Sequence, residues 1–148
     1  MIEKLKQLFA TTLDTERVLA DKEQTKKLAA VALMLDMIAV DGEQHDVEKN
    51  ILRQLLSDQF DVNSAEAKAL IEQAEKARQE ATDYYHFTAE INREFSEQEK
   101  IELIQSLWQL AWADNELHEL EQHVIRRLAS LLHVSHKDFI ATKLVVIQ

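Results

Sequence analysis

Residues 114–130 read DNELHELEQHVIRRLAS, and residues 41–57 repeat that pattern as DGEQHDVEKNILRQLLS. Seven positions are identical at an offset of 73 residues. Each copy places a cluster of carboxylates and one imidazole within eight residues, through the identical pairs Asp41/Asp114, Glu43/Glu116, His45/His118 and Glu48/Glu121. An internal repeat indicates that one structural unit occurs twice. The sequence therefore predicts two related halves, each with an acidic turn between two helices.

Outward from these two turns, apolar residues recur at helical spacing through most of the chain. Ser96 with Glu99 is the clearest capping box, a pair in which the first side chain caps a helix start and the second reaches back to it, and Asn63 with Glu66 forms another. Helix starts are predicted near Ile2, Lys22, His45, Asn63, Thr82 or Asp83, Ser96, His118 and Ser135.

These patterns predict an all-α fold, a single compact domain of about seven or eight helices built from two pseudo-symmetric helical-hairpin halves. The domain should span residues 1–148, with an N-terminal helix and a polar connection over 1–21. The repeat halves are expected at about 22–81 and 96–148. No stretch rich in glycine or serine divides the chain, so the two halves should share one core.

Composition removes several classes of function. The 148 residues contain no proline, no cysteine and a single glycine, Gly42. Phosphate-binding loops, dinucleotide-binding fingerprints and nucleophile elbows need glycines in tight turns. Without cysteine there is no disulfide, no thiolate metal site and no cysteine nucleophile. No arrangement of serine, histidine or lysine indicates a catalytic nucleophile, so we expect no catalytic residues and no enzyme.

Charge and hydropathy limit the kinds of partner that the protein is expected to bind. The formal net charge of −10 opposes binding to nucleic acid, because that affinity comes from basic surface against phosphate. The most apolar run, residues 28–40, is shorter than the roughly 20 residues of a membrane span. Residues 1–10 lack the apolar core of a signal peptide. We therefore expect a cytoplasmic protein with a protein partner, no nucleic acid and no membrane span; the sequence leaves its oligomeric state open.

Three interpretations of the acidic turns remain open, and one of them is an acidic patch that binds a protein partner. In the structural one, the carboxylates only stabilise helix starts, because the unpaired N–H groups and the positive dipole end favour anions there. Glu48 and Glu121 follow His45 and His118 by three residues, which is the glutamate position of a capping box.

In the second interpretation, the turns hold a divalent cation. Asp41 and Asp114 lie near a helix C-terminus, where the dipole disfavours an anion, and histidine is not a favoured N-cap residue. Oxygen ligands suit Ca²⁺, Mg²⁺ or Mn²⁺, and an imidazole shifts the preference toward Mn²⁺ or Zn²⁺. The spacing matches neither an EF-hand nor a zincin. The candidate ligands are Asp41, Glu43, Glu48, Asp114, Glu116 and Glu121, with His45 and His118 auxiliary.

Other polar and aromatic residues have structural explanations. Asp36 interrupts an apolar helix, and the repeat offset pairs it with Gln109 on a polar stripe, so we expect it at the rim of the core. The aromatic residues Trp108, Trp112, Tyr84, Tyr85 and Phe87 are expected in the core or at its edge.

The stretches AVDGEQHDVEKNILRQLLSDQFDV (39–62) and DYYHFTAEINREFSEQEKIELIQSLWQLAWADNELHELEQHVIRRLASLLHVSHKDFI (83–140) resemble the tellurite-resistance TerB-like family. The similarity is greatest to its small, stand-alone bacterial branch, and it covers about residues 23–145. It implies an all-helical fold of two repeated halves and an interaction role, since the family includes the domain preceding certain DnaJ-type co-chaperones. The implied metal site would use Asp41 with Glu48, and Asp114 with Glu121. The family usually has Asp-Gly at both turns, whereas this chain has Asn115 in the second; asparagine also tolerates left-handed geometry.

The function expected from the sequence is a non-enzymatic helical interaction module with a divalent-cation site at the two repeated turns. The alternative is a pure scaffold or adaptor whose acidic turns only cap helices and bind no metal. A metal-assisted enzyme is the third hypothesis, and the sequence shows neither the pocket nor the open coordination position that it needs.

Overall fold

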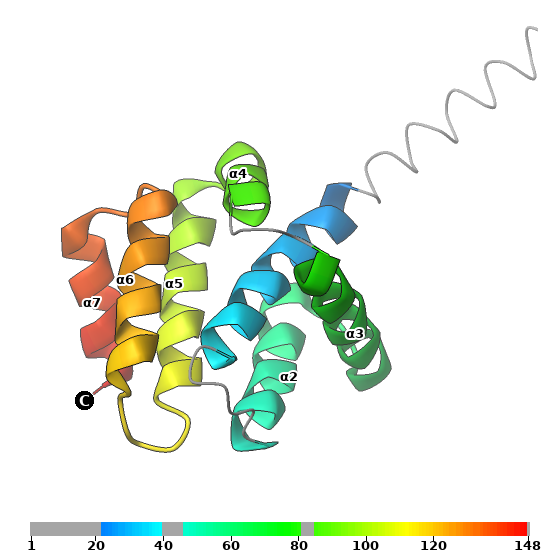
Figure 1. The fold of residues 1–148 in the computed structure, drawn as a ribbon, viewed down its shortest axis with the longest axis horizontal. Helices are drawn as coiled ribbons and strands as arrows, with labels where there is room; N and C mark the ends of the chain where they lie inside the picture. The colour runs from blue at the N-terminus through cyan, green and yellow to red at the C-terminus, as the bar shows by residue number, and fades with distance from the viewer. Residues whose placement is uncertain (1–21, 40–45, 81–84, 148) are drawn as a thin grey trace, which may run out of the picture.

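A helix over residues 22–38, apolar on almost every face from Leu28 onward, runs through the middle of the molecule (Figure 1). In this computed structural model, which describes residues 22–39, 46–80 and 85–147, the side chains from Ala30 through Met34 are 0% exposed. A helix that is hydrophobic all round is stable only when other elements surround it. The other helices are therefore arranged around this one.

The surrounding helices are α2 (Asp46–Phe60), α3 (Ser64–Glu80), α4 (Tyr85–Glu94), α5 (Glu97–Ala111), α6 (Glu119–Leu131) and α7 (His136–Val146). Both α6 and α7 pack against α5, while α2 contacts α3 and α5 (Figure 1). Their buried side chains form one hydrophobic cluster together with the central helix. The described residues contain helices and no strand, which confirms the predicted all-α class. None of the described helices is both long and apolar enough to cross a membrane.

The local helix signals predict the helix starts well. Ser96 caps α5 with its side-chain oxygen, and Glu99 reaches back to the Ser96 N–H, so the predicted capping box is confirmed. Asn63 accepts from the Glu66 N–H in the same way at the start of α3. Such caps contribute about 1 kcal/mol each, because they satisfy N–H groups that the helix leaves unpaired. The first predicted helix and the proposed starts at Thr82 or Asp83 lie outside the described residues.

Two pairs of the described helices begin at nearly the offset of the sequence repeat. Helix α6 begins 73 residues after α2, and α7 begins 72 residues after α3. The turns after α2 and α6 each contain a residue with positive φ, Asp61 at 51° and His133 at 60°. The two-half architecture itself stays a prediction.

The expectations for the aromatic residues are met only in part. Trp108 and Phe87 are buried in the core, whereas Tyr85 is 75% exposed and Trp112 is half-buried. Tyr84 lies outside the described residues. Helix α4 buries one narrow face, formed by Phe87, Thr88 and Ile91. Tyr85 falls off that face, so assigning it to the core was wrong.

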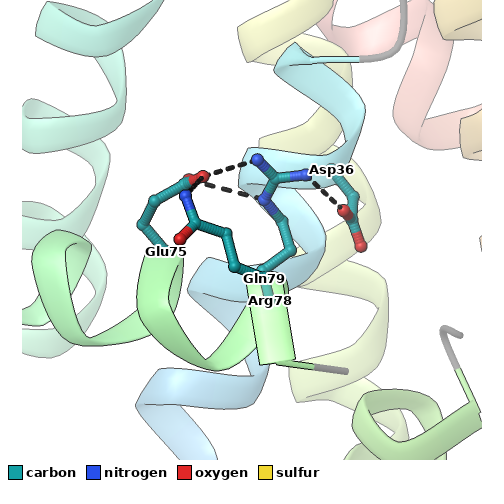
Figure 2. Close-up of polar contacts among 4 residues, drawn as sticks. All are labelled: Asp36, Glu75, Arg78 and Gln79. Atoms are coloured by element: carbon teal, nitrogen blue, oxygen red, sulfur yellow. Dashed lines mark hydrogen bonds and ion pairs between the residues drawn. The ribbon is translucent and has the colours of Figure 1, made fainter. Parts of the chain in front are cut away.

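Asp36, the charged residue within the central apolar run, is tied to α3 by an ion pair (Figure 2). Its side chain is 14% exposed, and its Oδ1 accepts a hydrogen bond from Arg78 Nη1 at 3.2 Å. Arg78 also contacts Glu75 at 2.5 Å, and Gln79 donates to the same glutamate. Burial raises the pKa of Asp36, and Arg78 opposes that shift. Asp36 therefore lies at the edge of the core, as expected, but it is paired there with a cation.

We predict that Arg78→Met destabilises the protein by about 1–3 kcal/mol at pH 7, because it leaves the Asp36 carboxylate partly buried beside an apolar stem. The folded-state pKa of Asp36, already raised, rises further in this variant. An acid with a raised folded pKa penalises the folded state at pH values above that pKa, and the penalty fades as the pH falls through it. Urea unfolding at pH 7 and pH 5 should show the deficit shrinking at the lower pH.

The matched control is Arg93→Met, because Arg93 is 67% exposed and pairs with Glu90 and Glu94 on its own helix. Such exposed pairs contribute little, so the change should be within about 0.5 kcal/mol. An Arg78→Met deficit of equal size at both pH values would show that Asp36 is not the group left uncompensated.

Candidate metal site at the second acidic turn

The second acidic turn, residues 112–118, joins α5 to α6 through a left-handed residue. The N–H of Trp112 closes the end of α5 by donating to the carbonyl of Trp108 at 2.9 Å. The N–H of Asn115 then donates to the carbonyl of Trp112, and Asn115 adopts φ 61°. Asparagine accepts this conformation more readily than most residues. It therefore serves at the position where the first turn has Gly42.

Asp114 organises this turn with both of its oxygens. Its Oδ1 accepts the backbone N–H of Glu116 at 3.1 Å, and its Oδ2 lies 3.3 Å from Nε2 of His118. One ligand atom each from Asp114, Glu116 and His118 lies within 4.8 Å of the other two. His118 occupies the N-cap position of α6, but its side chain makes no capping hydrogen bond. The imidazole therefore faces the carboxylates of the turn rather than the helix start.

The two glutamates of the repeat, Glu48 and Glu121, are buried, although each follows a turn that was expected at the surface. Each is the third residue of its helix, and they are 2% and 1% exposed. Glu121 Oε1 is 3.9 Å from Nε2 of His118. The three-residue ligand cluster therefore rests on a buried carboxylate. A carboxylate in the first turn of a helix is favoured by the helix dipole.

The sequence does indicate this burial, through apolar residues that follow each glutamate at helical spacing. Four and seven residues after Glu121 come Ile125 and Leu128, both 0% exposed. Leu52 and Leu55 follow Glu48 at the same spacing and are also buried. Residues at this spacing share a helix face, so both glutamates begin the inward-facing stripe of their helices.

Electrostatics in the turn favour opposite charges on Asp114 and His118. Desolvation alone would raise the pKa of Asp114, but the Glu116 N–H and His118 outweigh it, so the pKa lies below its ordinary value. The hydrogen bond that the imidazole donates to Asp114 raises the pKa of His118, and the charges of Glu121 and Glu116 act in the same direction. The turn therefore attracts positive charge, either a proton on His118 or another cation.

Of the predicted ligands, the structure brings together Asp114, Glu116 and His118, with Glu121 beneath them. Asp41, Glu43 and His45 lie outside the described residues. The C-terminal end of the helix over 22–38, the start of α2 and the α5–α6 turn all lie at the lower end of the molecule in Figure 1. The elements that flank both acidic turns therefore point to the same end.

The chemistry of this donor set is that of a mixed nitrogen and oxygen site. Two carboxylates and an imidazole suit Mn²⁺ or Zn²⁺ better than Ca²⁺, which prefers oxygen ligands alone. In a tetrahedral zinc site with bonds of about 2.0–2.2 Å, two ligand atoms stand about 3.3–3.6 Å apart. The ligand atoms of this cluster lie within 4.8 Å of one another, so the side chains would have to move closer together to bind such an ion.

A groove beside this turn was missed by the sequence analysis. It measures about 470 Å³, and Trp112 and Ala113, the first residues of the turn, form part of its lining. Gln105 and Gln109 of α5 lie in the same groove. The sequence signal was the pair of glutamines Gln105 and Gln109 followed by Trp112 in the apolar second half of α5, which marks an open face.

We predict that the His118 imidazole titrates above the ordinary pKa of about 6.5 and that Asp114→Asn lowers its pKa. The physical reason is the loss of the carboxylate that stabilises the imidazolium. Since the folded pKa is raised, this interaction stabilises the protein below the unfolded pKa and is lost as the pH rises through the folded one. NMR titration of the imidazole resonances, with His118→Gln for assignment, measures it.

Glu119→Gln is the matched control, because it removes one negative charge from an exposed residue that directly follows His118. It should shift the pKa of His118 less than Asp114→Asn does. If both variants shifted the pKa of His118 equally, the overall negative charge of the surroundings would explain its raised pKa, and the contact with Asp114 would not.

Comparison with protein families gives one match: the family model described as "Tellurite resistance protein TerB" matches residues 27–144. The matched segment contains both acidic turns and every helix from α2 to α6. Searches of curated proteins and of solved structures gave no match.

Proposed function

The chain belongs to the TerB family, and from that premise we propose that it is a non-enzymatic helical interaction module whose acidic turns bind a divalent cation. The observation that carries the proposal is the convergence of Asp114, Glu116 and His118 within 4.8 Å. The same residue types recur in the first turn at identical spacing. The expected partner is a protein in the cytoplasm rather than nucleic acid, because the net charge is −10.

The geometry supports a cation for a second reason. Three carboxylates, those of Asp114, Glu116 and Glu121, surround the imidazole of His118. Like charges at such distances repel unless a positive charge lies among them. A proton on His118 supplies one positive charge, and a metal ion supplies two. Because the imidazole must be neutral to bind a metal, proton and metal would compete at this site.

One observation favours the alternative, a scaffold without metal. The Asp114 Oδ1 is already engaged with the Glu116 backbone N–H, which is a turn-stabilising contact of the kind that aspartate makes without any ion. In this alternative the carboxylates shape the turn and stabilise the start of α6, and the module binds its partner through other surfaces. Metal titration distinguishes the two functions.

We predict that Mn²⁺ or Zn²⁺ raises the melting temperature more than Mg²⁺ or Ca²⁺ at equal concentration. A specific site stabilises the folded state by about 2.7 kcal/mol at one hundred times Kd, which corresponds to roughly 5–10 °C for a chain of this size. Asp114→Asn should remove most of this gain while keeping the acceptor for the Glu116 N–H. Thermal unfolding in metal-free buffer, followed by titration of each ion, measures it.

Glu119→Gln again serves as the matched control and should keep the full gain, because Glu119 is outside the ligand cluster. The cation proposal fails if no ion shifts the melting temperature at millimolar concentration. It fails also if Glu119→Gln loses as much as Asp114→Asn, since general charge screening would then explain the effect.

Stoichiometry decides whether the two turns share one ion. If they form a single site, calorimetry should give one ion per chain, and Asp41→Asn should abolish binding as completely as Asp114→Asn does. Two ions per chain, with each variant losing one of them, would instead show two independent sites. Glu72→Gln, on the exposed face of α3, controls for the change in net charge.

A further inference from the structure

The groove beside the acidic turn is lined by both apolar and polar side chains of three helices. Ile51 and Leu55 of α2 and Val145 of α7 are among the apolar ones. Trp112, at the start of the acidic turn, is another. Gln105 and Gln109 of α5 offer amide groups for hydrogen bonds. A groove of this composition fits the apolar face of a helix, which is a recurring mode of recognition between proteins.

Apolar side chains extend beyond the groove onto the surface. Leu144 and Val145, near the end of α7, are 60% and 57% exposed. Leu120, in the first turn of α6, is 56% exposed. The end of α7 and the start of α6 both lie at the end of the molecule that carries the acidic turn (Figure 1). Single exposed apolar residues are ordinary, but Val145 also lines the groove, so an apolar side chain there is open to a partner.

Carboxylates outnumber basic groups on this surface. Asp58 is the one charged residue in the groove lining, Asp114 and Glu116 follow Trp112 and Ala113 within three residues, and His118 of the same turn is the basic group among them. The basic residues of α2 that flank the groove-lining positions, Lys49 and Arg53, fall on other faces of the helix at 3.6 residues per turn. A partner helix therefore meets apolar side chains in the centre and negative charge at the rim.

We propose that this groove is the docking site for a basic amphipathic helix of a protein partner, with its apolar face on Trp112, Ile51 and Val145 and its lysine or arginine side chains against Asp58 and the acidic turn. The inference rests on the proposed interaction role and does not require a bound cation. The groove-lining positions of α2, residues 51–58, span about 10 Å. About two turns of a partner helix fit that length, and an interface this small gives weak, reversible binding.

The test uses the full chain in buffer containing EDTA at 150 mM salt, so that the cation site plays no part. The probe is a dye-labelled 14-residue peptide of leucine and lysine, with leucine at helical spacing. Two comparison peptides have leucine and glutamate in the same order, or leucine and lysine in strict alternation. Fluorescence anisotropy should show that the helical leucine–lysine peptide binds at least tenfold more tightly than either comparison peptide.

Variants locate the binding on the surface. Val145→Asp should weaken the binding of the helical peptide at least tenfold, and Asp58→Lys at least threefold. Matched controls are Leu131→Asp, at the far end of α6, and Glu72→Lys, on the exposed face of α3. Both should change the affinity less than twofold. Helical circular dichroism and the melting temperature should be the same for all four variants.

Three results would overturn the proposal. The controls could weaken binding as much as the groove variants, which would show attraction to net charge alone. The protein could bind all three peptides with the same affinity, whatever their residue order or sign of charge. Sedimentation equilibrium could show a dimer that Val145→Asp dissociates, in which case the occupant is a second copy of the chain. A metal-dependent melting shift that persists when the peptide fails to bind would leave the cation site standing while this inference fails.

Discussion

The burial of one helix on all of its faces is the constraint on which the rest of the structure depends. The side chains from Ala30 through Met34 have no exposure, so neighbouring helices must cover every direction around them. That requirement places α3 and α5 on either side, where Gln24 reaches Gln73 of α3 and Lys26 reaches Glu99 of α5. It also explains Arg78, because a carboxylate in such a helix is tolerated only with a cation beside it.

The position of the candidate site follows from this arrangement. Helix α5 ends where Trp112 closes its last turn, and the next residues must reverse direction so that α6 can return along the core. The reversal exposes Asp114 and Glu116 and buries Glu121, the first inward-facing residue of α6. Two exposed carboxylates therefore lie next to one buried carboxylate, because Glu121 is the first residue of α6 that faces the core.

Local signals in the sequence predict local structure, and contacts between distant residues account for what was missed. The capping pairs Ser96 with Glu99 and Asn63 with Glu66 are three residues apart, so their geometry follows from the helix itself. The partner of Asp36 is 42 residues away on another helix, and no periodicity identifies it. The groove also needs side chains from α2, α5 and α7 together. Helix types and starts were predictable because they depend on near neighbours, whereas the groove depends on how three helices pack.

The acidic turn and the groove share a structural element, which makes them parts of one surface. Trp112 is the C-cap residue of α5 and also lines the groove, and Asp114 begins the ligand cluster two residues later. A change in the turn that moved the end of α5 would move a wall of the groove with it. Both features also depend on the same excess of acid, since carboxylates that attract a metal ion attract a lysine or arginine side chain by the same Coulomb interaction. Negative charge at this end of the molecule therefore favours both proposed ligands, and the apolar side chains of the groove select between them, because only a partner helix can cover them.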